Sequence, residues 1–144
     1  MVTAIQVVMD CHDPDRLARF WATALHYKLQ DPPEGYVNWE QWLSAMGIPE
    51  EQWNDASAVV DPDGRGPRIY FQRVPESKTV KNRVHLDLNV GGPHGTAPEV
   101  RRERVDAEVQ RLVEVGATKA QAMDLRGEYW VVMADPEGNE FCVQ

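Results

Sequence analysis

The sequence predicts an α+β fold in which one structural unit of strand, helix and three strands occurs twice. Two acidic turns mark the repeat: Asp-Pro-Asp-Gly at residues 61–64 and Asp-Pro-Glu-Gly at residues 135–138. Each turn precedes a short segment in which apolar and polar residues alternate, and each half also contains a stripe of apolar residues at helical spacing. Alternation of period two is typical of a half-buried strand, and an i, i+3, i+4 stripe is typical of an amphipathic helix.

The first half begins with alternating residues 4–10, which predict a strand. Asp13 and Pro14 then resemble an N-cap followed by proline at the first helical position. A helix is therefore predicted over 14–25, with its apolar stripe on Leu17, Phe20, Trp21, Ala24 and Leu25. The rest of this half contains a tryptophan-bearing insertion with a helical turn within residues 29–60, and strands at 56–60 and 68–74.

The second half repeats this order. Residues 84–90 predict a strand, and a loop rich in glycine and proline follows. A helix is expected over 99–115, ending at Gly116. The last three strands are expected near 119–123, 129–134 and 139–144.

Length and charge restrict the function. The chain has 144 residues, the size of one ordinary domain. Its formal net charge of −8 disfavours nucleic acid and anionic membrane as partners, because both reward dense Lys and Arg. No apolar run reaches the length of a membrane helix. Two cysteines, Cys11 and Cys142, are too few for a disulfide framework, so a cytoplasmic protein with reduced thiols is expected.

The strand alternation sorts side chains onto two faces. One face is apolar and is expected to pack on the helices: Ile5, Val7, Met9, Ile69, Phe71, Val84, Leu86, Leu88, Phe141 and Val143. The other face is rich in hydrogen-bonding groups: Gln6, Val8, Asp10, Arg68, Tyr70, Gln72, His85, Asp87, Asn89, Glu140, Cys142 and Gln144. If the sheet curves, the second face lines a polar cleft suited to a small molecule.

Four stretches carry a family resemblance. They are Asp-Cys-His-Asp-Pro at 10–14 with Phe20 and Trp21, Gly-Pro-Arg at 66–68, Val-Pro-Glu-Ser-Lys-Thr-Val-Lys-Asn-Arg-Val-His-Leu-Asp-Leu at 74–88, and Asp-Pro-Glu-Gly-Asn-Glu-Phe-Cys-Val at 135–143. Over essentially its whole length the chain resembles the glyoxalase-like domains of the vicinal oxygen chelate superfamily. That resemblance implies one domain over 1–144, with a first module at about 1–76 and a second at about 82–144. It also implies eight strands in a curved half-barrel with helices outside, and a homodimer.

The resemblance implies four metal-ligand positions, which fall here on Gln6, Tyr70, His85 and Cys142. Metal-using members usually carry His or Gln, Glu, His and Glu there, so both carboxylates are missing. Two neutral ligands are a poor cage for hard divalent cations. We therefore expect no metal and no cofactor, although a displaced site that combines His85 with Asp87 or Glu140 stays open.

The predicted function is binding of a small molecule, as in glyoxalase and bleomycin-resistance-like proteins. The expected ligand-binding residues are Gln6, Tyr70, His85, Asp87 and Cys142, with Trp39 or Trp42 stacking on the ligand. The alternative is a metal-dependent lyase, isomerase or dioxygenase with His85 as a ligand. A purely structural dimerisation module is a third interpretation. The tryptophans could equally form a small core in the insertion, and Cys142 could be an inert buried thiol.

Overall fold

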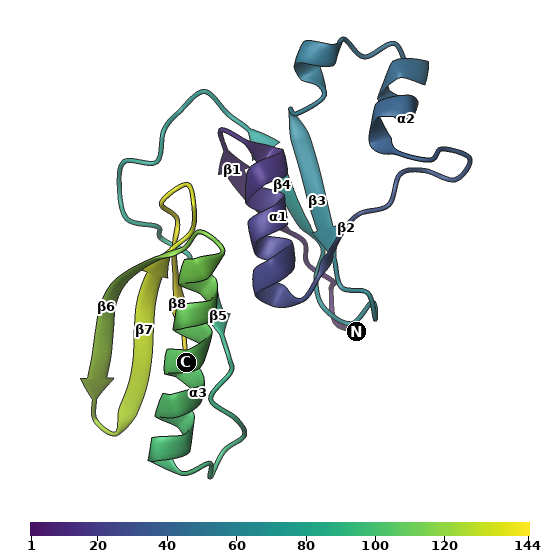
Figure 1. Ribbon diagram of the computed structural model, residues 1–144. Coiled ribbons are helices and arrows are strands. Elements are labelled where there is room, and N and C mark those ends of the chain that lie inside the picture. Colours follow the sequence, from purple (N-terminus) through teal and green to yellow (C-terminus); the bar gives the residue numbers. More distant parts are fainter. The chain divides into compact units, whose positions relative to one another are not determined.

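Two units, Met1–Ser77 and Lys78–Gln144, make up the chain in the computed structural model, which describes residues 1–144 (Figure 1). Each contains a four-stranded sheet and a long helix, in the order strand, helix, three strands. The predicted α+β fold with two tandem βαβββ modules is therefore confirmed.

The first unit is a sheet of order β1-β4-β3-β2, with β1 and β4 parallel and the other neighbours antiparallel. Its strands are β1 (Val7–Cys11), β2 (Lys28–Leu29), β3 (Ala56–Val60) and β4 (Ile69–Arg73). Helix α1 (Pro14–Leu25) contacts β2, β3 and β4. The core between helix and sheet consists of Leu17, Trp21, Val59, Ile69 and Phe71, each at most 2% exposed.

Helix α1 has the predicted bounds because nearby residues in the sequence determine both its first residue and its apolar face. The Asp13 carboxylate accepts a hydrogen bond from the Arg16 backbone N–H at 3.2 Å, and Pro14 begins the helix. The helix ends at His26, whose φ of 58° lies in the left-handed region. The buried stripe then holds α1 on the sheet, since apolar burial is the main stabilising term.

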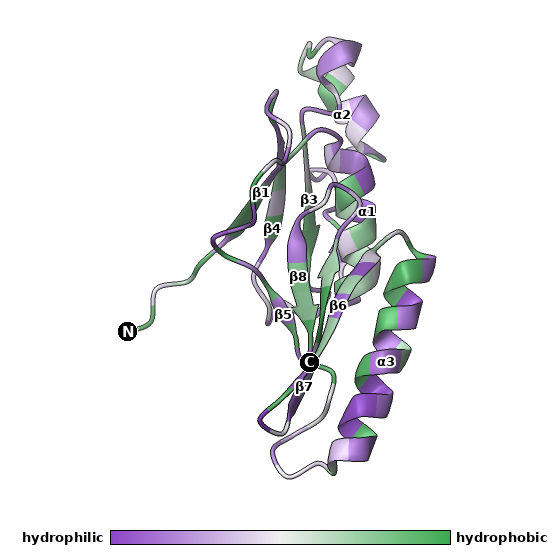
Figure 2. Ribbon diagram, turned by 90° about the vertical axis from the view of Figure 1, so that its left-hand side faces the viewer, coloured by the Kyte–Doolittle hydropathy of each residue, from purple (hydrophilic) through white to green (hydrophobic).

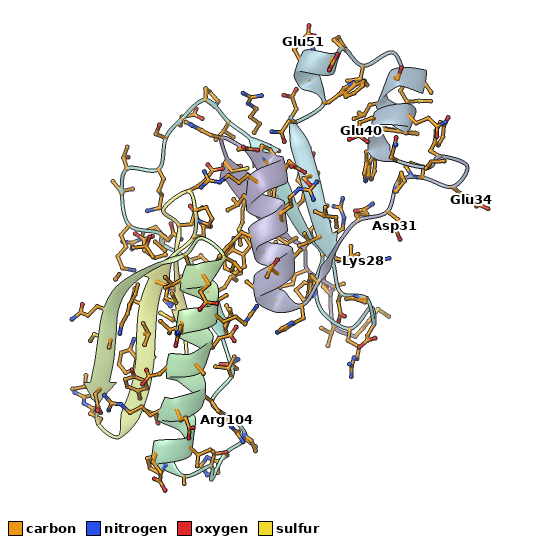
Figure 3. The ribbon with its side chains drawn as sticks, viewed as in Figure 1. Lys28, Asp31, Glu34, Glu40, Glu51 and Arg104 are labelled. Atoms are coloured by element: carbon orange, nitrogen blue, oxygen red, sulfur yellow. The ribbon has the colours of Figure 1, made fainter.

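The insertion of the first unit carries α2 (Trp39–Ala45) and the 3₁₀ turn η1 (Glu50–Gln52). Figure 1 shows α2 at the end of a long connection after β2, away from the sheet of its unit. No residue of α2 is fully buried. Several acidic side chains labelled in Figure 3 lie along this segment: Asp31, Glu34, Glu40 and Glu51. Tertiary packing therefore contributes less to α2 than to α1.

The second unit is a sheet of order β5-β8-β7-β6, with β5 and β8 parallel. Its strands are β5 (Asp87–Leu88), β6 (Thr118–Leu125), β7 (Glu128–Ala134) and β8 (Glu140–Val143). Helix α3 (Pro98–Glu114) contacts β6, β7 and β8 and carries hydrophilic and hydrophobic segments along its length (Figure 2). The core of this unit includes Val105, Leu112, Val131, Met133, Phe141 and Val143.

Two predicted strands differ from the observed ones. The strand expected over 84–90 pairs only at Asp87–Leu88, and the strand expected over 4–10 is shifted to Val7–Cys11. Val84 and Ile5, which were expected on the apolar face, are 82% and 74% exposed. Both precede the residues that pair with a neighbouring strand, so they lie outside the sheet and beyond the cover of a helix. No helix in the structure is both long and apolar enough to span a membrane.

Candidate functional site

The polar face of the second unit is organised by the parallel pairing of β5 with β8. This pairing places Asp87 opposite Cys142, and the Cys142 N–H donates to the Leu86 carbonyl at 2.9 Å. Because side chains alternate along a strand, Glu140 lies on the same side of β8 as Cys142. His85 directly precedes β5, and its side chain contacts that of Asp87. At the end of this face, the Gln144 amide donates to the Asn89 side chain at 2.9 Å.

Three side chains of this face converge: His85, Asp87 and Cys142. One ligand atom from each lies within 4.8 Å of the other two, and His85 Nε2 is 3.2 Å from Asp87 Oδ1. The side chains of His85 and Asp87 are 41% and 42% exposed, whereas Cys142 is buried. An imidazole, a carboxylate and a thiol thus meet at the surface of one sheet.

The surroundings of Cys142 favour the protonated form of its thiol. Burial raises its pKa, and the Asp87 carboxylate raises it further by charge repulsion and by accepting a hydrogen bond from the thiol; Lys81 opposes this rise. Reactive cysteines need a lowered pKa and electropositive surroundings. The geometry therefore favours the inert-thiol interpretation over a nucleophile.

Glu140 is committed to the segment that leads into β5. Its carboxylate pairs with Lys78 Nζ at 3.0 Å and accepts from the Asn82 backbone N–H at 3.0 Å. The Asn82 side chain in turn donates to the Glu140 carbonyl at 3.1 Å. The Asn82 hydrogen bond, aided by Lys78, lowers the pKa of Glu140 to about 2. Of the two carboxylates considered for a displaced site, Asp87 is the one that joins His85.

The polar face of the first unit is built around Arg68, just before β4. Its Nη1 donates to the Gln6 side-chain oxygen at 3.0 Å, and its Nε donates to the Gln30 side-chain oxygen at 2.6 Å. Its guanidinium carbon lies 5.3 Å from the centre of the Tyr70 ring. No carboxylate forms an ion pair with Arg68, so a positive charge is held in place by two neutral amides and an aromatic ring.

The strand registers show which positions correspond between the two units. Parallel pairing joins Val8 to Tyr70 in the first unit, as it joins Asp87 to Cys142 in the second. Two residues earlier along each segment, Gln6 corresponds to His85, and Arg68 corresponds to Glu140. The second unit therefore presents metal-binding chemistry where the first presents an amide, a phenol and a guanidinium.

Trp39 and Trp42 pack against each other in the insertion. Their rings are 5.6 Å apart in an edge-to-face arrangement, and both are half-buried. Trp39 Nε1 donates to the Gln30 carbonyl at 2.7 Å. Because the Gln30 side chain also holds Arg68, polar contacts run from α2 to the polar face of the first unit.

Two residues of this network were not among the predicted site residues. The strand alternation placed Arg68 on the polar face. Its positive charge among neutral neighbours on this face of its strand was the signal that could have identified it as a site residue. Gln30 lies just after β2, in a segment whose pairing the sequence pattern does not show. Among the predicted site residues, Gln6 and Tyr70 both contact Arg68, and His85, Asp87 and Cys142 lie close to one another.

Comparison with known proteins agrees with this architecture. The family model for the glyoxalase-like domain matches residues 6–144. A possible glyoxalase from Bacillus cereus has a TM-score of 0.61 at 14% identity, covering 100% of this chain and 99% of that one. A glyoxalase/bleomycin resistance protein/dioxygenase family enzyme from Burkholderia phytofirmans has a TM-score of 0.60 at 16% identity, with coverage of 96% and 94%.

A third similar structure comes from a resistance protein. A mutant of the fosfomycin resistance protein FosX from Listeria monocytogenes, complexed with Mn(II) and 1S,2S-dihydroxypropylphosphonic acid, has a TM-score of 0.61 at 12% identity. The match covers 100% of this chain and 90% of that one. A comparison with curated proteins gives no match. At these identities the structural matches show a shared fold.

Proposed function

Because this chain belongs to the glyoxalase-like domain family of the vicinal oxygen chelate superfamily, we propose that it binds a small molecule on the polar faces of its sheets. The observation that carries the proposal is the alignment of accessible hydrogen-bonding groups by strand register in both units. In the first unit these groups surround Arg68, and in the second they surround His85 and Asp87. A merely solvated face would carry flexible Lys and Glu side chains instead.

In this proposal each predicted residue has a defined part. Gln6, Tyr70, His85 and Asp87 hydrogen-bond the ligand, and Cys142 contacts it from the floor of the sheet. Trp39 or Trp42 provides a flat apolar surface, which suits planar or hydrophobic groups. The contact from Trp39 through Gln30 to Arg68 supports a role of the insertion next to the ligand.

Arg68 indicates the charge of the ligand. Its guanidinium is oriented by Gln6 and Gln30 but has no carboxylate to neutralise it. Arginine forms charge-assisted, often bidentate hydrogen bonds with carboxylate and phosphate groups. We therefore propose that the ligand carries an anionic group.

The four metal positions of the superfamily do not fit a metal in this chain. The position usually held by Glu in the first unit is Tyr70, whose ring faces the Arg68 guanidinium. The oxygen of Gln6 already accepts a hydrogen bond from the same guanidinium, and a fixed positive charge repels a cation. We propose that the family's four-ligand site does not form here.

Thermal-shift measurements with matched probes test the proposal. Benzoate and phenylphosphonate are compared with neutral benzamide and benzyl alcohol. An anionic ligand at 100 times its Kd is expected to stabilise the protein by about 2.7 kcal/mol. Arg68→Gln should weaken binding about 10- to 100-fold, since a hydrogen bond to a charged group contributes about 1.5–3 kcal/mol.

The exposed Arg65, which pairs with Asp63, provides the control: Arg65→Gln should leave binding unchanged. If neither these probes nor a broad metabolite panel shifts the melting temperature, the proposal fails. The protein is then better described as a structural dimerisation module.

A second candidate is a metal-dependent lyase, isomerase or dioxygenase with His85 as a ligand. The approach of His85, Asp87 and Cys142 within 4.8 Å favours it. Turnover of a superfamily-type substrate that requires a metal, and that is lost on His85→Ala, would establish this candidate over simple binding.

We also propose that the protein is a cytoplasmic homodimer without nucleic-acid or membrane partners. The net charge of −8 supports the exclusion of polyanionic partners. Light scattering of the purified protein gives its mass in solution, and a monomeric mass would contradict the homodimer.

A further inference from the structure

We infer that the second unit alone binds a zinc-type divalent cation through His85, Asp87 and Cys142, with a fourth coordination position left open. The proposed function places the same three residues against the small-molecule ligand, but metal binding does not require that ligand to be present. The site also differs from the four-position site of the superfamily, because it uses Asp87 and takes no ligand from the first unit.

The geometry of the three donors is close to that of a bound ion. In a tetrahedral zinc site, neighbouring N, O and S ligands lie roughly 3.4–3.6 Å apart, given metal–ligand lengths of about 2.0–2.3 Å. Here the His85 Nε2 to Asp87 Oδ1 distance is 3.2 Å, and all three atoms lie within 4.8 Å of one another. Small side-chain rotations suffice to close the remaining gap around an ion.

The backbone beneath the cluster is fixed by the sheet. Asp87 and Cys142 are paired residues of β5 and β8, and Cys142 is held by its N–H bond to Leu86. The segment preceding His85 is tied to β8 by Glu140, which binds Lys78 and Asn82. Asp87 and Cys142 lie on paired strands, so they are better preorganised than ligands on free loops, and His85 directly precedes β5.

The donor chemistry selects the class of metal. Imidazole and thiolate suit zinc, while Mg²⁺ and Ca²⁺ require oxygen ligands. A carboxylate and a thiolate together balance the two charges of the cation, and metal binding would deprotonate the thiol. Three protein ligands with one open position are typical of zinc sites that accept water or a small ligand.

The first unit lacks the means to contribute. Its corresponding positions are Gln6, Val8 and Tyr70, and Arg68 engages both polar members of that set. The metal site inferred here and a family-type site therefore make opposite predictions for variants of Gln6 and Tyr70.

Metal titration of the untagged full-length protein tests the inference. Zn²⁺ is expected to bind with one-to-one stoichiometry, and Co²⁺ to show a sulfur-to-cobalt charge-transfer band. Mg²⁺ should not compete. We expect each of three variants to weaken Zn²⁺ binding: His85→Ala, Asp87→Asn and Cys142→Ser. Loss of a residue that only hydrogen-bonds a metal ligand weakens binding about 10- to 100-fold, so loss of a ligand itself should weaken it more.

Three controls sharpen the result. Cys11→Ser changes the other buried thiol, which donates to the Gln72 carbonyl, and should leave the charge-transfer band in place. Gln6→Ala and Tyr70→Phe should leave Zn²⁺ affinity unchanged. A melting curve without metal shows whether each variant is folded. Asp87→Asn replaces an exposed side chain, so this variant still tests the inference if Cys142→Ser does not fold.

Three outcomes would overturn the inference. The first is a wild-type protein that binds no Zn²⁺. The second is binding that survives Asp87→Asn and Cys142→Ser, which would mark adventitious surface sites. The third is binding lost on Gln6→Ala or Tyr70→Phe, which would indicate a family-type site shared by both units.

Discussion

At the scale of single residues, two carboxylates of the second unit have different roles: Glu140 stabilises the fold, and Asp87 belongs to the candidate metal site. Glu140 and Asp87 lie on the same face. Glu140 pairs with the Lys78 ammonium and accepts from the Asn82 backbone N–H, and these contacts lower its pKa. Asp87 instead faces an imidazole and a thiol. Sequence alternation placed both on this face but could not separate their roles, because partners such as Lys78 and Asn82 come from an irregular segment.

Glu140 predicts a specific acid sensitivity. Its folded-state pKa of about 2 lies below the ordinary value of 4.5, so its contribution to stability is present above pH 4.5 and is lost as the pH falls toward 2. Glu140→Gln should be less stable at pH 7 by about 1 kcal/mol, the difference between a charged and a neutral hydrogen bond. Urea denaturation between pH 7 and pH 2.5 measures both effects.

The control for this prediction is Glu103→Gln, which changes an exposed carboxylate on α3 that makes no ion pair. The wild type and Glu103→Gln should lose stability in parallel below pH 4.5, whereas Glu140→Gln should lose less. Equal slopes in all three proteins would show that the Glu140 contacts contribute nothing in solution.

At the scale of elements, helices were predicted more accurately than strands. The bounds of α1 agree with the prediction because Asp13, Pro14 and the apolar stripe are all read locally. The strand predicted over 84–90 pairs only at Asp87–Leu88, since alternation does not reveal where a neighbouring strand ends. Strand pairing is a property of two segments, and the exposed Val84 shows the limit of reading one of them alone.

The N-cap of α1 gives the prediction at this scale. Asp13 accepts from the Arg16 N–H at 3.2 Å and from the Asn54 side chain at 2.8 Å. Asp13→Ala should therefore cost about 1–2 kcal/mol of stability, as expected for loss of a helix cap. The matched control is Asp15→Ala, which removes an exposed i, i+4 pair with Arg19 and should cost about 0.5 kcal/mol or less. Chemical denaturation of the two variants should rank them in this order, and the reverse order would contradict the capping role.

At the scale of the whole molecule, the duplication gives two polar faces with different chemistry. Residues in corresponding positions, such as Gln6 and His85, were predicted to line one shared hollow. Alternation predicts which side chains share the polar face of each strand. The step from two polar faces to one hollow also needs a curved sheet, which the resemblance to the superfamily implied, so the shared hollow stays a prediction.

The different chemistry of the two faces predicts that one variant separates their ligands. Arg68→Gln should weaken binding of phenylphosphonate about 10- to 100-fold, because it removes a hydrogen bond to a charged group. It should leave Zn²⁺ affinity unchanged, because the inferred metal site takes no ligand from the first unit. Isothermal titration of wild type, Arg68→Gln and Arg65→Gln with each probe measures both effects. A fall in Zn²⁺ affinity in Arg68→Gln would contradict the assignment of the metal to the second unit alone.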